Sequence, residues 1–200
     1  MADKREQAVL DHLRRSRETL ERAADDRNVI AAIVAIADRV IAALRAGGKI
    51  LLIGNGGSAA DAQHIAAELV GRYAFDRAPL SAIALTTDTS ALTAIGNDYA
   101  FDLVFDRQLR AVGHRGDVLI AMSTSGISPN ILAALKSARE LGITTVGFTG
   151  TKNALMQPLC DLVLVVPSDQ TPLIQQTYMT AAHAICALVE REMFPPAGRS

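Results

Sequence analysis

Apolar and polar residues follow two different patterns along the chain. Over residues 4–46 the apolar residues recur every three or four positions, which is typical of amphipathic helices, and Gly47-Gly48 ends this region. A polar break at residues 25–28 offers an N-cap, so the pattern predicts two helices. The first of them is too polar on its outer face to belong to a core alone.

Beyond this region, short runs of β-forming residues alternate with segments of helical spacing. The runs are KILLIG, SAIALTT, DVLIAMS, TTVGFTG and DLVLVVPS. Strands that alternate with helices predict a parallel sheet covered on both faces, because each crossover places a helix on the sheet. Right-handed crossovers give an α/β fold, a doubly wound three-layer αβα sandwich with a five-stranded parallel sheet and additional N-terminal helices. A final helix is expected from Pro172 to Phe194, with Thr171 as its N-cap.

Length and composition narrow the class of protein. With 200 residues, half of them hydrophobic, the chain can bury one sizeable core and fits one domain. A net charge of -1 gives no general attraction to nucleic acid, and no apolar run is long enough to cross a bilayer or to act as a secretory signal. Cys160 and Cys186 lack the spacing of a redox or zinc pair, which suits structural thiols in a reducing cytoplasm. We expect a cytoplasmic protein without nucleic acid or membrane partners.

The first predicted strand ends in a glycine-rich loop, GNGGS, at residues 54–58. Ligands of open α/β sheets bind outside the carboxyl ends of the strands, and a helix N-terminus there favours an anion. A tight turn is the alternative interpretation, but three glycines in four residues exceed what a turn needs. The loop also matches the dinucleotide spacing through Ala59, yet Asp88, the nearest strand-end acid, lies too far along to hold a ribose. No nucleotide cofactor is therefore expected.

A second loop, STSGISPN at residues 123–130, carries four hydroxyl groups where a strand gives way to a helix. Pro129 suits the first helical position and Ser128 the N-cap. Capping explains one of these hydroxyls but not all four. Hydroxyl and N–H donors at one helix terminus suit a phosphate group, and no GxxxxGK[ST] motif is present. The loop therefore predicts a phosphorylated small molecule as ligand.

Candidate proton carriers lie on two of the predicted helices. His64 and Glu68 are four positions apart, so their side chains are neighbours on one face. Gln175 and His183 are eight positions apart on the final helix and can face one groove. An ordinary surface pair and a hydrogen-bonded core histidine are the simpler interpretations of each set taken alone. A carboxylate and an imidazole beside a phosphate site, however, can move a proton between adjacent sugar carbons through an enediol, which is aldose–ketose isomerisation.

The histidines and the carboxylate leave a second chemistry open. His64, Glu68 and His183 could equally bind Zn²⁺, which would polarise a sugar carbonyl. Gln175 is a poor zinc ligand by residue type.

Taken together, these motifs resemble the SIS-domain phosphoheptose isomerases, which convert sedoheptulose 7-phosphate to D-glycero-D-manno-heptose 7-phosphate. The resemblance is carried by GNGGSAADAQHIAAEL, LTTDTSALTAIGNDYAFDLVF, GDVLIAMSTSGISPNILAAL and the helix from Gln175 to His183, and it covers nearly the whole chain. It implies a flavodoxin-like SIS domain over residues 47–195. Residues 1–46 would be a helical segment that packs on this core and lies at the interface of a homo-oligomer. That oligomer would be a tetramer with sites shared between subunits.

The resemblance also implies roles for individual residues. Glu68 would be the base and His183 the acid of the first step of nucleotide-activated heptose biosynthesis, which supplies lipopolysaccharide or capsule. The implied zinc ligands are His64, Glu68, Gln175 and His183. The implied substrate-binding residues are Asn55, Gly56, Gly57, Ser58, Glu68, Asn97, Asp98, Ser123, Thr124, Ser125, Ser128 and Gln175.

Four single positions depart from the family pattern, and the segment Lys152-Asn153-Ala154 lacks its usual paired glycines. Leu173, Gln176 and Tyr178 replace a basic residue, a glutamate and a histidine, and Ile127 replaces an asparagine in the hydroxyl loop. These departures spare the proton carriers but leave the identity of the phosphosugar open, so an isomerase of another phosphosugar is an alternative. A non-catalytic regulator, such as the SIS-domain tetramer that binds the replication initiator DnaA, is another. Retention of both proton carriers favours the enzyme.

Overall fold

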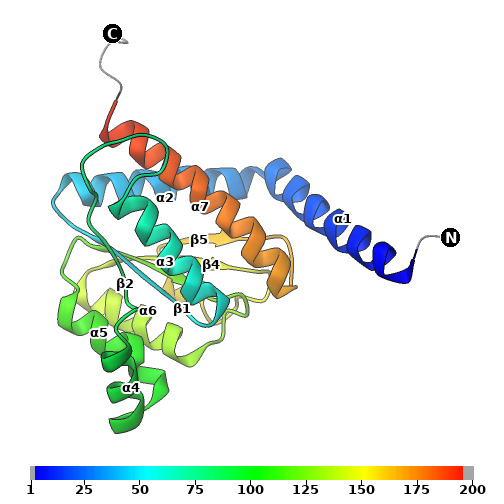
Figure 1. Ribbon diagram of the computed structural model, residues 1–200. Coiled ribbons are helices and arrows are strands. Elements are labelled where there is room, and N and C mark those ends of the chain that lie inside the picture. The colour runs from blue at the N-terminus through cyan, green and yellow to red at the C-terminus, as the bar shows by residue number, and fades with distance from the viewer. Residues whose placement is uncertain (1–2, 196–200) are drawn as a thin grey trace.

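The computed structural model describes residues 3–195 and begins with two consecutive helices. Helix α1 spans Lys4–Asp25 and α2 spans Arg27–Arg45, separated by Asp26 alone. The Asp26 carboxylate accepts a hydrogen bond from the backbone N–H of Asn28, so the predicted polar break is an N-cap. Figure 1 shows α1 extending away from the rest of the molecule, while α2 lies over the sheet.

All five predicted strands form, and they pair in parallel in the order β2-β1-β3-β4-β5. Their bounds are Ile50–Gly54 for β1, Ala82–Ala84 for β2, Val118–Met122 for β3, Thr144–Thr149 for β4 and Leu162–Val165 for β5. The chain moves outward from β1 to β2 and then returns to the other side of β1 with β3. The strand order therefore reverses between β1 and β3, and such a switch point is where open α/β sheets bind ligands.

Helices cover both faces of this sheet, which confirms the predicted three-layer sandwich (Figure 1). One layer holds α2, α3 (Gly57–Val70) and α7 (Thr171–Met193). The other holds α4 (Thr89–Asp98), α5 (Val104–Val112) and α6 (Pro129–Leu141). Two short 3₁₀ helices, Phe101–Leu103 and Gln157–Leu159, lie in the connections.

The central strands divide the core into two halves. In β1, Ile50 and Leu52 belong to the apolar cluster under α2, α3 and α7, whereas Leu51 and Ile53 belong to the cluster under α5 and α6. Every residue of β1 and β3 is buried. Side chains of a strand alternate between faces, so a strand covered on both sides must be apolar throughout. This is why both strands appear in the sequence as uninterrupted apolar runs.

Two predicted helix caps differ from the structure in detail. Helix α7 begins at Thr171 itself with Gln170 as its N-cap residue, so the assignment of Thr171 as cap is wrong. The Thr171 hydroxyl instead lies 3.2 Å from the hydroxyl of Thr124. Ser128 occupies the N-cap position of α6 as predicted, but its hydroxyl lies 3.2 Å from Ser123 Oγ and caps nothing. The Thr171 contact joins segments 47 positions apart, whereas the Ser128 contact lies within one loop, five positions from Ser123.

Within residues 3–195, none of the helices combines the length and the apolar composition that a bilayer crossing requires. The two cysteines form no disulfide, and Cys186 is buried. Burial raises the pKa of both the Cys160 and the Cys186 thiols to about 12, so they remain protonated. This environment is that of structural thiols, as the sequence predicted.

Candidate functional site

The hydroxyl loop and the glycine loop begin side by side at the switch point, since Gly54 pairs with Met122 across β1 and β3. Ser123 Oγ accepts a hydrogen bond from the N–H of Gly126 at 3.1 Å and is buried, whereas Ser125 is exposed. Together with Thr124 and Ser128, these residues surround the N-terminus of α6. The structure thus brings the four predicted hydroxyls together at one helix terminus, where N–H groups and the helix dipole favour an anion.

The glycine loop is fixed to α6 by a pair of amides. Asn55 Nδ2 donates to Asn130 Oδ1, and Asn130 Nδ2 donates to Asn55 Oδ1, both at 2.9 Å. Asn130 is 2% exposed, so this reciprocal pair is largely shielded from water. Gly56, the N-cap residue of α3, has a φ of 55°, a conformation that favours glycine. Asn130 was not predicted as a site residue, because only its partner 75 positions away gives it this role.

His64, Glu68 and His183 form a cluster where α3 packs on α7. His64 Nε2 lies 3.2 Å from Glu68 Oε1 and 3.4 Å from His183 Nε2, and one ligand atom from each residue lies within 4.8 Å of the others. Zinc bonds of 2.0–2.1 Å at tetrahedral angles place neighbouring ligand atoms about 3.3 Å apart. The donor types and their spacing therefore fit a metal ion. The ring of Tyr73, whose centroid is 5.9 Å from that of His183, lies beside the cluster.

Gln175 lies near the start of α3. Its Nε2 atom is 3.4 Å from Ser58 Oγ, and a Cβ atom added to Gly57 would lie 2.6 Å from the same nitrogen. Ser58 and His64 are six positions apart, which is about 9 Å along a helix. The role of Gln175 as a fourth metal ligand remains a prediction.

Asn97 and Asp98 end helix α4, in the layer opposite α3 and α7 (Figure 1). Both are exposed, and Asn97 Nδ2 donates to Asp98 Oδ1 at 2.8 Å. Across residues 3–195, no hydrogen bond joins either side chain to α3, α6 or α7. The structure therefore does not bring this pair into the site within one copy of the chain, and its substrate role remains a prediction.

A buried ion pair, Arg77–Glu190, lies behind the cluster. Glu190 accepts hydrogen bonds from the N–H groups of Tyr73 at 2.8 Å and Ala74 at 2.7 Å and from Arg77 Nε at 3.2 Å. Both side chains of the pair are 2% exposed. Burial alone would raise the pKa of Glu190, but the two backbone N–H groups and the guanidinium outweigh it and lower that pKa. Local sequence patterns do not indicate this pair, because its members are 113 positions apart.

Arg77 also determines how α3 ends. Its guanidinium donates to the carbonyl oxygens of Glu68, at 2.8 Å, and of the next residue, at 2.7 Å. These carbonyls belong to the last turn of α3 and have no partner within the helix. The Arg77–Glu190 pair thus connects the end of α3 that carries Glu68 to α7, which carries His183.

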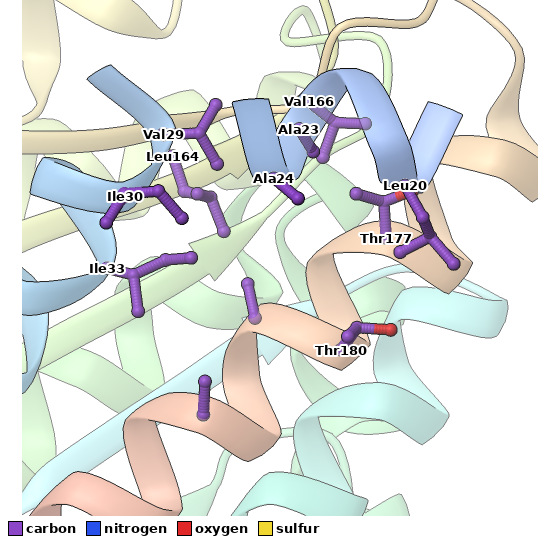
Figure 2. A pocket seen from close by; sticks show the side chains of 12 residues that line it. Leu20, Ala23, Ala24, Val29, Ile30, Ile33, Leu164, Val166, Thr177 and Thr180 are labelled. Carbon is purple, nitrogen blue, oxygen red and sulfur yellow. The ribbon is translucent and has the colours of Figure 1, made fainter. Parts of the chain in front are cut away.

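The opposite face of α7 lines an apolar cavity of about 370 Å³ (Figure 2). Figure 2 shows Thr177 and Thr180 of α7 facing Val29, Ile30 and Ile33 of α2 across it. The cavity continues to α1 and to the edge strand β5. It contains none of the predicted site residues, so this apolar cavity and the polar cluster lie on different faces of the same helix.

Comparisons with known proteins agree with this geometry. The family model described as "SIS domain" matches residues 11–150. A phosphoheptose isomerase of Bradyrhizobium sp. (strain ORS 278) is 57% identical over 98% of this chain and 100% of its own length. The structure of phosphoheptose isomerase GmhA from Neisseria gonorrhoeae has a TM-score of 0.87 at 41% identity, covering 92% of this chain and 98% of that one. A phosphoheptose isomerase structure from Francisella tularensis has a TM-score of 0.90 at 32% identity, covering 94% of this chain and 100% of that one.

Proposed function

Because the chain belongs to the phosphoheptose isomerase family of SIS-domain proteins, we propose that it converts sedoheptulose 7-phosphate to D-glycero-D-manno-heptose 7-phosphate. The observation that carries this proposal is the cluster of His64, Glu68 and His183, with ligand atoms within 4.8 Å of one another. A carboxylate and imidazoles at this separation can act on adjacent atoms of one substrate. The three relatives named above match this chain over nearly their full length. We therefore propose the complete isomerase activity for this chain and not a part of it.

Proton transfer then follows from the residues of the cluster. Glu68 takes a proton from C1 of the ketose, the C–H electron pair forms the C1–C2 double bond, and His183 gives a proton to the oxygen at C2. The resulting enediol loses the proton of its C1 hydroxyl and gains one at C2, which produces the aldose. Glu68 Oε1 faces His64, whereas Oε2 has no hydrogen-bond partner among the residues that the structure describes. One oxygen is therefore free to carry the proton.

We further propose that His64, Glu68 and His183 hold Zn²⁺, with Gln175 as a fourth ligand by family resemblance. When bound, the ion would polarise the carbonyl group of the sugar. Separations of 3.2 and 3.4 Å between neighbouring donor atoms support a site in which these three residues would hold the ion. The role of Glu68 as both ligand and base requires that its two oxygens divide these functions.

The phosphate group is proposed to bind at the N-terminus of α6, held by Ser123, Thr124, Ser125 and Ser128. The amide pair of Asn55 and Asn130 supports this arrangement, since it fixes the glycine loop beside the same terminus. Binding at C7 would place the sugar chain across the switch point, with C1 and C2 directed towards α3 and α7. Asn97 and Asp98 would then contact the sugar of a neighbouring copy, as sites shared between subunits require.

The chain is proposed to form a homo-tetramer in the cytoplasm, with residues 1–46 at its interfaces. Two observations support association. Val9, Leu10 and Leu13 of α1 are 59%, 43% and 59% exposed, and the apolar cavity between α1, α2 and α7 is open to such side chains. The free thiols support a reducing compartment. The product would enter heptose biosynthesis for lipopolysaccharide or capsule.

The decisive experiment is incubation of the purified protein with sedoheptulose 7-phosphate in deuterium oxide, followed by NMR of the sugar carbons. A heptose 7-phosphate signal with deuterium at C2 is expected, because a proton that passes through Glu68 exchanges with solvent. Saturable binding without deuterium incorporation would contradict the isomerase and would favour a regulator. Incorporation into a different phosphosugar only would keep the chemistry and change the substrate.

A further inference from the structure

Thr149, the last residue of β4, carries a buried hydroxyl group without a partner. The residue is 0% exposed, and among residues 3–195 its Oγ1 atom is the one buried side-chain nitrogen or oxygen that lacks a hydrogen-bond partner. Buried polar groups in folded proteins are nearly always paired, because an unpaired one has lost its contacts with water and gained nothing in return. The Thr149 hydroxyl therefore calls for a state of the protein in which it has a partner.

Thr145, on the same strand, shows that burial alone does not leave a threonine unpaired here. It is also 0% exposed, and it lies four positions before Thr149, so both side chains are on one face of β4. Its Oγ1 atom donates to Asp161 Oδ2 at 3.0 Å and accepts from the N–H of Asp161 at 3.0 Å. What distinguishes Thr149 is its place at the carboxyl end of the strand, where the ligands of open α/β sheets bind.

The Thr149 hydroxyl lies beneath the hydroxyl loop, residues 123–130. A Cβ atom added to Gly126 would lie 3.4 Å from Thr149 Oγ1 and 2.7 Å from the carbonyl oxygen of Lys152, so the loop backbone packs directly on the end of β4 and on the segment that follows. The N–H of Gly126 is used within the loop, since it donates to Ser123 Oγ at 3.1 Å and to the Ser123 carbonyl oxygen at 3.2 Å. None of the carbonyl oxygens of the loop accepts the proton of Thr149 in the described residues.

A phosphate group at this loop would change which way the loop peptides face. An anion attracts N–H groups, and a trans peptide has its N–H and its carbonyl oxygen on opposite sides. A loop peptide that turns its N–H towards the anion therefore turns its carbonyl oxygen towards the protein interior, where the Thr149 hydroxyl lies. Gly126 has a φ of 66°, and glycine accepts φ values of either sign, so this rotation costs less there than at other residues.

We propose that Thr149 is a positioning residue of the phosphate site, whose hydroxyl donates to a backbone carbonyl oxygen of the hydroxyl loop when a phosphate group is bound. This inference rests on the proposed function, since it concerns the phosphate site of the sugar. The unpaired hydroxyl destabilises the free protein, and the bond that it forms stabilises the complex. Thr149 thus raises the affinity for phosphate without touching the ligand.

The test compares stability and phosphate affinity in Thr149→Val, which removes the hydroxyl and keeps a branched side chain. Urea denaturation without ligand should give a midpoint no lower than that of the wild type, because no hydrogen bond is lost. Titration with inorganic phosphate, followed by ³¹P NMR, should show about five- to tenfold weaker binding, as for loss of one hydrogen bond. Ser125→Ala should also weaken this binding, which would locate the phosphate at the hydroxyl loop.

Thr145→Val is the matched control, with the same substitution on the same face of the same strand. It should lower the urea midpoint, because the N–H and the carboxylate of Asp161 lose their partner. It should bind inorganic phosphate like the wild type, since Thr145 lies four positions from the carboxyl end of β4, about 13 Å along the strand.

The outcomes separate the role of Thr149 from the proposed function. Wild-type affinity in Thr149→Val, with weaker binding in Ser125→Ala, overturns the role of Thr149 alone. A urea midpoint in Thr149→Val as low as in Thr145→Val also overturns it, since the hydroxyl would then have a partner in the free protein. Wild-type protein that binds no phosphate, or that binds it no better than Ser125→Ala does, overturns the phosphate site and the role of Thr149 with it. The NMR experiment with sedoheptulose 7-phosphate decides the isomerase activity independently.

Discussion

Glu68 and Glu190 are both close to the interface of α3 and α7, but their carboxylates differ in the number of hydrogen bonds that they accept. Glu190 accepts hydrogen bonds from two backbone N–H groups and from Arg77, and its side chain is 2% exposed. Glu68 has a side chain that is 22% exposed and faces one histidine nitrogen. Three fixed donors occupy most of the roughly four acceptor sites of the Glu190 carboxylate, and its burial keeps a metal ion or a substrate away. The number of fixed partners, more than residue type, separates the structural carboxylate from the one that we propose to react.

The largest effect on stability is expected when Glu190, the carboxylate with three donors, is replaced. Glu190→Gln should lower the free energy of unfolding by about 3–5 kcal/mol, because it leaves the Arg77 guanidinium buried without a counter-charge. Urea denaturation measures this loss. Glu192→Gln on the same helix is the control, since Glu192 pairs with Arg45 at the surface, with side chains 64% and 57% exposed. It should change stability by about 1 kcal/mol or less.

The pH dependence of the stability difference between wild type and Glu190→Gln tests whether Glu190 is ionised in the folded protein. The pKa of Glu190 is lowered from 4.5 on folding, so its carboxylate stabilises the folded state above the unfolded pKa. That contribution is lost as the pH falls through the lowered, folded pKa. The stability gap between wild type and Glu190→Gln should therefore shrink in acid, as the pH falls below the unfolded value of 4.5. A gap that stays constant down to pH 3 would contradict the ionised pair.

The second largest effect is expected at Glu68, the carboxylate with a single partner. Glu68→Gln should lower kcat on sedoheptulose 7-phosphate by about a hundredfold or more, as for loss of a general base. Its unfolding temperature should stay close to that of the wild type, because its side chain has one partner and is partly exposed. Steady-state kinetics and thermal unfolding check the two statements. Glu140→Gln on α6, whose side chain is 62% exposed, is the control and should leave kcat unchanged. Unchanged turnover in Glu68→Gln would remove this residue from the mechanism.

The smallest effect is expected at the hydroxyl loop, which we propose to bind the phosphate group without moving a proton. Ser125→Ala should raise KM for the phosphorylated sugar about tenfold and leave kcat nearly unchanged, because one hydrogen bond to a charged group is lost. Ser125 is the cleaner choice, since it is exposed while Ser123 is buried. The comparison with unphosphorylated sedoheptulose is the control. An equal loss on both sugars would show that Ser125 does not contact the phosphate.

Features that depend on residues a few positions apart were predictable. The Asp26 cap bonds to a residue two positions away, and the His64–Glu68 contact follows from the helical repeat. Strands β1 and β3 could be recognised in the sequence because they are buried on both faces and are therefore uninterrupted apolar runs. Their arrangement follows from the general handedness of crossovers, and no single residue decides it.

Features that depend on packing between distant segments were not predictable. The hydrogen-bonded residues Tyr178 and Asp61 are 117 positions apart, and so are Glu190 and Tyr73. Thr171 was assigned as a cap because nothing local showed that its hydroxyl would meet Thr124 instead. Glu190 has the same residue type as the exposed Glu192 two positions later. Glu190 is buried because the segment of residues 71–81 packs against it, and local sequence patterns do not predict a contact between such distant segments.

Helix α7 carries Gln175, Tyr178, His183 and Glu190, and each of them contacts α3 or the segment that follows it. The ribosome synthesises the chain from the N-terminus to the C-terminus, so α3 and both loops leave the ribosome well before α7. Until it has been synthesised, Arg77 has no carboxylate and His64 no second imidazole. A stalled ribosome that stops before residue 183 would thus hold a nascent chain without an assembled site, and catalytic competence would appear in one late step of translation.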